Sequence, residues 1–494
     1  MHTFKALVTN TLVGATGTIA TIGVGMALKI LLVRVLSLQD FGVLVSAQAM
    51  VGFLLFAAAL CIPDAVVWLA ARDVETEGSA GSTLTTGVAL GAATGMVASL
   101  ALFLIAGLAS PQAGGLPTTV ALLGLMIPLT VVGEIFAASL RSVGVLWPKV
   151  IALDLGRPAL SLLAAGVLAA LDRLTLFSMS VVLVGASVVT GAIPAALAWR
   201  AAATRPVWSC EARRVRAILR YGLPLLAAGL LAGPIVNNGI PAILALVVST
   251  SDVALYSASL ALQVVVYIPT AAVEQAILPR WSLNGGPSRQ EFQTVTRWSL
   301  LLASVPFAVL WLAPSAVLAT LFGARYAGAG LLVQIAALTT YLGASVGPNE
   351  AALRANGDTR WIFIARLIAA VSGLGLASAL ISAWGALGAV VGLSTASATV
   401  NALYAIRLWR RQAIQPLTAE YLKAVVAMLA SLTGTYLIAS RVAGGVIATL
   451  STVTTVYPCL LALSLVLLGM EEPRLVMSAL RTLSRRRHPA ASAR

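Results

Sequence analysis

Long runs of apolar residues follow one another along the whole chain, separated by short polar segments. Apolar and polar residues do not alternate within the runs as they do in a membrane β-strand, so the pattern predicts helices. A helix of about 20 apolar residues crosses the hydrocarbon core of a bilayer, where every backbone group must be satisfied internally. The runs predict fourteen membrane-spanning helices, over residues 10–32, 42–71, 83–109, 118–140, 150–171, 174–198, 222–248, 253–278, 298–321, 328–347, 361–382, 385–407, 423–440 and 444–468.

The first run has some features of a signal peptide, because Lys5 precedes a long apolar segment. A cleavable signal has a shorter apolar core that ends in a small-residue cleavage site. Here the run is long, no such site precedes the next charged residue, and thirteen further runs follow. We therefore assign residues 10–32 to the first membrane span.

Composition supports a membrane protein and excludes several kinds of catalytic site. Apolar residues make up 59% of the 494 residues and charged residues 10%, whereas a soluble domain has about 45–50% and about 25%. Both histidines lie in the tails, and the three cysteines are far apart without a CxxC pair, so we expect no histidine or zinc site and no disulfide framework. None of the four lysines is followed by Ser or Thr, which excludes a P-loop and ATP hydrolysis by that route.

The formal charge of +15 raises the question of where the cations lie, because a basic chain is often a nucleic-acid binder. With an even number of spans, both termini and alternate loops share one side of the membrane. That side holds about 26 of the 32 Lys and Arg residues and the opposite loops hold about 4, which is the bias of the positive-inside rule. We therefore expect both termini in the cytoplasm, a multi-pass protein of the cytoplasmic membrane, and membrane lipids rather than nucleic acid as partners. The outward loops have at most about ten residues, so no external domain is expected.

Two local patterns recur at nearly one spacing and indicate an internal repeat. Ser37-Leu38-Gln39-Asp40 is echoed by Ser249-Thr250-Ser251-Asp252, and the LRSVG segment at 140–144 is echoed by LRANG at 353–357. Each pattern falls at the same point of a six-span cycle, so the two halves run the same way through the membrane, as in one class of secondary transporter. We expect an all-α membrane protein with an N-lobe over 1–200, a basic amphipathic linker over 201–221, a C-lobe over 222–408, two further helices over 409–470 and a basic cytoplasmic tail over 471–494.

Five segments follow one another along most of the chain, each at a predicted helix end: VLSLQDFGVLVSAQA at 35–49, ILRYGLPLLA at 218–227, LFGARYAGAGLLVQIAAL at 321–338, ALRANGDTR at 352–360 and GALGAVVG at 385–392. In this order and at these positions they resemble motifs of the oligosaccharide flippases (Wzx-like) of the MOP exporter superfamily. The resemblance implies a V-shaped, two-lobed, alternating-access transporter that moves a polyprenyl-pyrophosphate-linked sugar from the inner to the outer leaflet. It also implies that no cofactor is needed and that a polysaccharide polymerase and glycosyltransferases act with it.

Other interpretations stay open at this point. A sister branch flips the lipid-linked peptidoglycan precursor and tends to carry several arginines in its first spans, where this chain has only Lys29 and Arg34. A drug or cation antiporter of the same superfamily usually has twelve spans. A membrane polymerase or ligase needs a large external loop, and a non-transporting scaffold would have lost the polar residues of its spans.

Ionisable residues inside spans are costly and are functional candidates by default. Lys29 lies about twenty residues into the first span and is followed by Arg34. Lys29 either extends its ammonium to the outer interface or faces a cavity and attracts pyrophosphate. Asp64 and Glu274 occupy nearly equivalent repeat positions, and either pair with Arg72 and Arg280 in a structural ion pair or bind a coupling cation.

Three further charged residues lie in the fourth and fifth spans. Asp154 and Arg157 are three residues apart, which favours a pair within one helix. Glu134 has no obvious local partner and is a candidate for a buried protonatable group.

The seventh span contains a segment that should interrupt its helix. Residues 233–241 read GPIVNNGIP, with two prolines and two asparagines. Broken helices often mark transporter sites, so Asn237 and Asn238 are candidates for the substrate site, with a hinge as the alternative. Gln263 in the eighth span is a further candidate for hydrogen bonds to a sugar.

Overall fold

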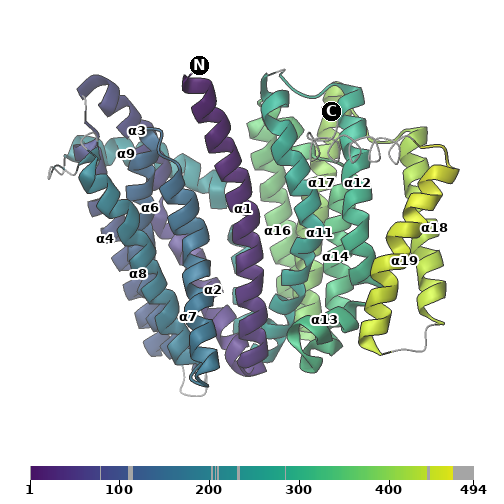
Figure 1. Cartoon of the computed structure of the whole chain (residues 1–494). Coiled ribbons are helices and arrows are strands. Elements are labelled where there is room, and N and C mark those ends of the chain that lie inside the picture. The colour runs from purple at the N-terminus through teal and green to yellow at the C-terminus, as the bar shows by residue number, and fades with distance from the viewer. Residues whose placement is uncertain are drawn as a thin grey trace, which may run out of the picture. The chain divides into compact units, whose positions relative to one another are not determined.

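The computed structural model describes residues 2–77, 79–108, 115–201, 204–205, 207, 211–230, 234–283, 285–441 and 445–470. Every regular element in these ranges is a helix, and they contain no strand. The helices, shown in Figure 1, are α1 (His2–Val35), α2 (Leu38–Ala59), α3 (Ile62–Glu77), α4 (Gly81–Leu108), α5 (Leu116–Gly124), α6 (Met126–Ser142), the π-helix η2 (Pro148–Leu155), α7 (Gly156–Ala170), α8 (Leu176–Arg200), α9 (Ala212–Leu230), α10 (Pro234–Val247), α11 (Thr250–Leu283), α12 (Arg289–Leu312), α13 (Pro314–Phe322), the 3₁₀-helix η4 (Ala324–Ala329), α14 (Gly330–Ser345), α15 (Asn349–Ala355), α16 (Thr359–Trp384), α17 (Ala386–Gln412), α18 (Ala419–Ala439) and α19 (Val446–Leu467).

The prediction of an all-α membrane protein with about fourteen spans is confirmed. Within the described ranges, twelve stretches are long and apolar enough to cross a bilayer. Of the other two predicted spans, the first falls within the 34-residue α1, and the seventh falls on the end of α9 and on the shorter apolar helix α10. Large apolar side chains are exposed along these helices, including Phe103 (63% exposed), Leu163 (68%) and Ile447 (79%). Apolar exposure of this extent is expected of side chains that face lipid.

The second predicted span is divided into α2 and α3. The chain turns at Leu60 and Cys61, which both have positive φ angles (46° and 50°). Pro63 in the first turn of α3 explains the break, because proline has no N–H to donate to the residue four positions earlier and its ring collides with that carbonyl.

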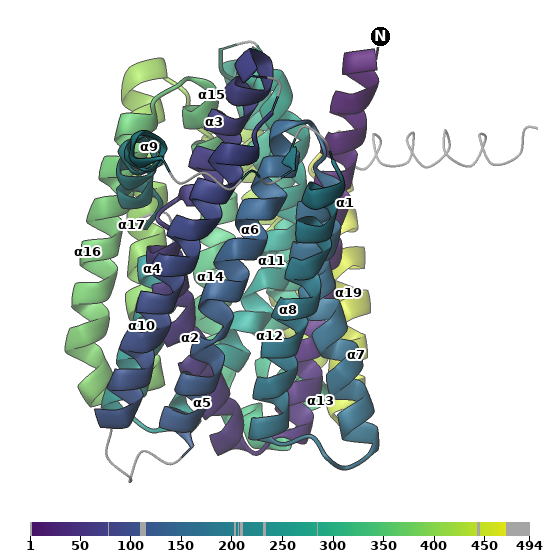
Figure 2. The ribbon, with the colours of Figure 1, turned by 90° about the vertical axis from the view of Figure 1, so that its left-hand side faces the viewer.

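The seventh predicted span, 222–248, is also divided, but at an earlier position than the sequence suggested. Residues 222–230 belong to α9, which continues from the linker, and Pro241 lies inside α10 rather than at a break. Figure 2 shows α9 nearly end-on while α4 and α6 run vertically, so α9 lies across these helices. The 14 residues of α10 rise about 21 Å, which is less than the hydrocarbon core of about 30 Å.

The chain divides into two compact units, residues 1–261 with 363–400 and residues 262–362 with 401–494. In the first unit α6 packs against α3, α4 and α8, and α1 packs against η2 and α7. In the second unit α12 packs against α14, α18 and α19. The arrangement of two six-helix lobes stays a prediction.

Both repeated sequence patterns adopt matching local structures. Ser37 and Ser249 each accept a hydrogen bond from the backbone N–H three residues later, that of Asp40 (3.0 Å) and that of Asp252 (3.2 Å), as helix N-caps do. At the second pattern Gly144 (φ +83°) and Gly357 (φ +72°) end their helices in the left-handed region, and the backbone N–H of the next residue bonds to the carbonyl five positions back (3.0 Å in both). The repeat seen in the sequence is therefore present as two copies of a cap and two copies of a helix end.

Within the first unit α16 and α17 approach closely at small residues. A Cβ on Gly373 would collide with the Cβ of Ala396 and lie 2.9 Å from the Gly392 carbonyl oxygen. Small residues four apart allow this close approach between membrane helices.

Candidate functional site

A cluster of four ionisable side chains lies in the first unit where α6, η2 and α7 meet. The Lys149 ammonium donates hydrogen bonds to Glu134 Oε1 and Asp154 Oδ1, both at 2.8 Å. The side chains of Lys149 and Glu134 are each 24% exposed and that of Asp154 is 43% exposed. One lysine thus joins an acid of one helix to an acid of the next, and Glu134 has the partner that the sequence did not reveal.

The π-helical conformation of η2 explains how Lys149 reaches Asp154. Residues five apart lie on different faces of an α-helix, whereas a π-helix repeats its hydrogen bonds every five residues and places them on one face. The prediction of an Asp154–Arg157 pair rested on α-helical spacing, and Asp154 bonds to Lys149 instead. π-Helical turns occur frequently at functional sites.

Arg157 lies within electrostatic range of Glu134 and Asp154. Its Nε and Nη2 atoms are buried and have no hydrogen-bond partner among the residues that the structure describes. A guanidinium has five donors and no acceptor, so the free donors of Arg157 call for a water, an anion or a carboxylate oxygen. Charges balance within the cluster, which holds two acids and two bases.

Lys29 is held by a helix of the same unit. Its ammonium donates to the backbone carbonyl of Ser257 in α11 at 3.1 Å. An ammonium has three donors, so two are left for other groups. Arg34 lies in the last turn of α1 with an exposed side chain.

Asp64 pairs with Arg141 at the end of α6, at 4.0 Å from Nη2 to Oδ1. Arg72, the expected partner, lies instead over the Trp68 ring, 4.8 Å from its centroid. Trp68 in turn stacks on Tyr221 with ring centroids 5.1 Å apart. These five side chains line one pocket of about 520 Å³.

Glu274 of α11 belongs to a second group of charged residues, in the second unit. Glu350 and Arg354 of α15 lie close enough to interact electrostatically with its carboxylate, and the Tyr267 hydroxyl is within hydrogen-bonding range. Arg354 also forms an ion pair with Glu350. The side chain of Arg280, the expected partner of Glu274, lies outside the described residues.

The arginines of these two groups are related by the internal repeat. Arg141 and Arg354 are the second residues of the two LR-x-x-G patterns, and each lies at the end of a helix beside an acid of its own unit. Sequence reasoning counted both arginines, and Lys149, only as topological charges. The repeat itself is the signal that would have singled out Arg141 and Arg354.

The polar candidates of the seventh and eighth predicted spans lie on α10 and α11, respectively. Asn238 of α10 lies against α2. A Cβ added to Gly52 of α2 would be 3.4 Å from the Oδ1 atom of Asn238. Asn237 is exposed, and Gln263 of α11 is half-buried.

The fold is shared with solved transporters of low sequence identity. A structure titled "Lipid II flippase MurJ, inward closed conformation" superposes with a TM-score of 0.74 at 11% identity, over 92% of this chain and 99% of that one. An inward-facing multidrug resistance MATE family transporter of the MOP superfamily gives 0.62 at 14% identity, over 80% and 94%. A MOP superfamily transporter from Pyrococcus furiosus gives 0.53 at 15% identity, over 83% and 95%. The chain therefore shares its fold with solved flippase and transporter structures.

A family model described as "Polysaccharide biosynthesis protein" matches residues 31–289, more than half of the chain. The chain belongs to this family, and the resemblance seen in its motifs is confirmed. A search of curated protein sequences finds no match. The chain is therefore a member of a polysaccharide biosynthesis family and has a fold shared with solved flippase and transporter structures.

Proposed function

We propose that this chain moves a polyprenyl-pyrophosphate-linked oligosaccharide from the cytoplasmic to the outer leaflet by alternating access. The observation that carries the proposal is the match of a polysaccharide biosynthesis family to a chain that shares a flippase fold over 92% of its length. Lipid-linked sugars are assembled on one side of a membrane and used on the other, so a transporter of this family has a substrate that must cross. We place the protein in the cytoplasmic membrane of a prokaryote with both termini inside, because the arginines gather on that side.

Lys29 is the first candidate for contact with the pyrophosphate. Its ammonium lies in a membrane span and uses one of three donors on the Ser257 carbonyl, which leaves two for phosphate oxygens. Arg34 would add a second cation near the same helix end. Asn237, Asn238 and Gln263 would supply hydrogen bonds to the sugar.

The cluster around Lys149 is the candidate for coupling to an ion gradient. Protonation of Glu134 or Asp154 would weaken a bond to Lys149 and leave Arg157 with an unbalanced charge. Binding of a proton or another cation would thus change the hydrogen bonds and ion pairs that Lys149 of the π-helix forms with these two acids. The two acid–arginine groups, Asp64 with Arg141 and Glu274 with Arg354 and Arg280, are gate candidates at the helix ends.

Deletion of the gene followed by analysis of lipid-linked intermediates tests the proposal. We expect a lipid-linked oligosaccharide to accumulate on the cytoplasmic leaflet and to disappear when the wild-type chain is supplied. Lys29→Ala should restore less flipping than wild type at equal membrane abundance. Lys423→Ala is the matched control, because the Lys423 side chain is 42% exposed and pairs at 2.9 Å with Glu420, three residues away on the same helix. Absence of any accumulated lipid-linked sugar would overturn the proposal.

The same experiment distinguishes the proposed function from two related ones. Accumulation of the lipid-linked peptidoglycan precursor would favour the function named for the structure with a TM-score of 0.74. Increased drug sensitivity without accumulated lipid would favour an antiporter, as the MATE likeness suggests. A pull-down of the tagged chain would test the proposed polymerase and glycosyltransferase partners.

A further inference from the structure

One side of α9 is fixed to the first unit by residues that recur every four positions. Arg214 Nη1 pairs with Asp73 and donates to Thr83 Oγ1 at 2.9 Å. Ile218 is fully buried, and a Cβ on Gly222 would collide with the Leu60 carbonyl oxygen. This stripe fixes the rotation of α9 about its own axis, so its other side has a defined direction.

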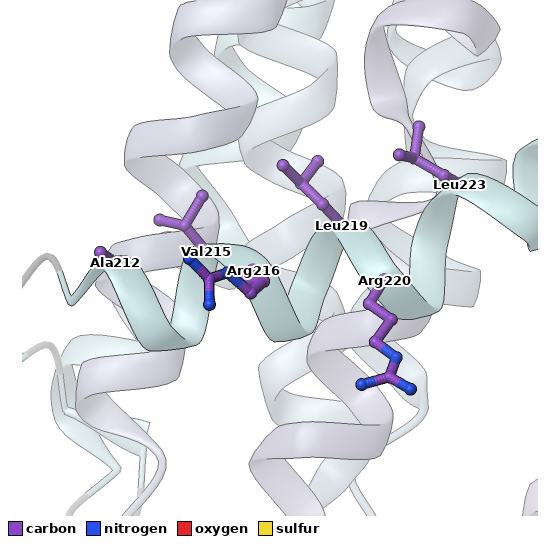
Figure 3. A pocket seen from close by; sticks show the side chains of 6 residues that line it. All are labelled: Ala212, Val215, Arg216, Leu219, Arg220 and Leu223. Atoms are coloured by element: carbon purple, nitrogen blue, oxygen red, sulfur yellow. The ribbon is translucent and has the colours of Figure 1, made fainter.

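The opposite side of α9 is open and amphipathic. Val215, Leu219 and Leu223 extend from one side of the helix in Figure 3, and Arg216 and Arg220 extend from the adjoining side. These residues and Ala212 line an open groove of about 720 Å³. Leu223 is 49% exposed, although it is apolar.

The charge of this face has one sign. Residues 212–230 contain four arginines and no Asp or Glu. Two acids, Asp73 and Glu211, form ion pairs with Arg214 on the fixed side. The open face therefore offers an apolar stripe about 16 Å long, from residue 212 to 223, beside two exposed cations one helical turn apart.

We infer that the open face of α9 lies in the headgroup–acyl boundary of the cytoplasmic leaflet and binds anionic phospholipid through Arg216 and Arg220. The helix crosses the membrane helices of its unit (Figure 2), so it runs along the membrane surface. Helices of this kind bury their apolar face in the boundary and place basic residues at the phosphates. Charge complementarity selects anionic over neutral lipid, and the inference does not depend on what the protein transports.

Native mass spectrometry of the full chain in nanodiscs tests the lipid choice. Nanodiscs of phosphatidylcholine with and without phosphatidylglycerol supply the probe. Each basic residue near an anionic surface contributes about 1 kcal/mol, or about fivefold in affinity, so R216Q/R220Q should retain phosphatidylglycerol about 25-fold more weakly. R410Q/R411Q removes the same charge from two exposed residues at the end of α17 and should retain it as wild type does. If the two variants lost phosphatidylglycerol retention equally, the assignment of the lipid site to Arg216 and Arg220 would be overturned.

A depth measurement tests the apolar stripe separately. Bimane is attached at Leu219→Cys, or at Arg213→Cys on the basic side as control, in a chain whose native cysteines are serine. Lipids brominated in the upper acyl chain should quench the label at 219 at least twofold more than at 213. Equal quenching, or a label at 219 that no lipid reaches because protein covers it, would overturn the inference. Retention of undecaprenyl pyrophosphate, but not phosphatidylglycerol, through Arg216 and Arg220 would assign the face to substrate and would also overturn it.

Discussion

Replacing Lys149 by methionine removes the charge that joins two acids of the first unit while keeping a side chain of similar length. In the native protein the ammonium makes two bonds of 2.8 Å, to Glu134 and to Asp154. After the change both carboxylates remain, with Arg157 still within their electrostatic range. The variant therefore measures how much the lysine bridge stabilises the α6–η2 junction.

The magnitude follows from the exposure of the partners. Hydrogen bonds to charged groups contribute about 1.5–3 kcal/mol each, and breaking a fully buried ion pair costs about 3–5 kcal/mol. The side chains here are between 24% and 43% exposed, so solvent screening selects the lower figure for each bond. We expect Lys149→Met to lower the free energy of unfolding by about 3 kcal/mol.

The chain offers a matched control in Lys423, whose bond to Glu420 has nearly the same length, 2.9 Å. Both side chains of that pair are more than 40% exposed, and the residues are three apart on one helix. Exposed pairs contribute about 0.2–1 kcal/mol, so Lys423→Met should cost about 0.5 kcal/mol.

Unfolding by sodium dodecyl sulfate in mixed micelles, followed by circular dichroism, gives both free energies. A double-mutant cycle with Glu134→Gln should yield a coupling of about 1.5 kcal/mol between Lys149 and Glu134. The reasoning is refuted if Lys149→Met costs no more than Lys423→Met, or if the cycle gives no coupling. Either result would mean that the close contact contributes nothing beyond an exposed ion pair.

Two further predictions concern helix packing and pH. Gly373→Leu should lower the free energy of unfolding by about 3 kcal/mol, because the Gly392 carbonyl blocks the new side chain; Gly375→Leu, with nothing within 4 Å of its Cβ, should cost far less in the same assay. The hydrogen bonds from Arg407 hold the pKa of Asp358 below its usual value. The stabilisation from this pair is then present above the unfolded-state pKa of about 3.9 and is lost as the pH falls through the lower folded-state pKa, so wild type and Asp358→Asn should converge in melting temperature in acid. A difference that grows as the pH falls would contradict that sign.

The membrane helices were predictable because each depends on local composition. Apolar runs marked nearly every span, and the two copies of each repeated pattern adopt the same local structure, a helix cap or a helix end. The division of the second span at Leu60 and Cys61 was missed although Pro63 signals it. The predicted start of the seventh span, at residue 222, lies too early in the chain. Residues 222–230 are apolar, but they are the end of α9 and not the beginning of the next helix.

The partners of the charged residues were less predictable, because they depend on contacts between helices. Asp64 was expected to meet Arg72, eight residues away, but Arg72 lies over Trp68 and the carboxylate meets Arg141 of another helix. Asp154 was matched to Arg157 by α-helical spacing, which does not hold next to a π-helix. Helical spacing finds a partner only when the residues share one regular helix.

The π-helix also bears on how chain length can vary in this part of the protein. A π-turn can be regarded as an α-turn into which one residue has been inserted. Deleting one residue between Lys149 and Asp154 would let η2 close as an α-helix and would bring the two residues four apart, a spacing at which they remain neighbours. The helix could then keep its ion pair while every residue before the deletion shifts by one position relative to α7. In this stretch a one-residue change in length alters the register of a helix without necessarily removing its central charge contact.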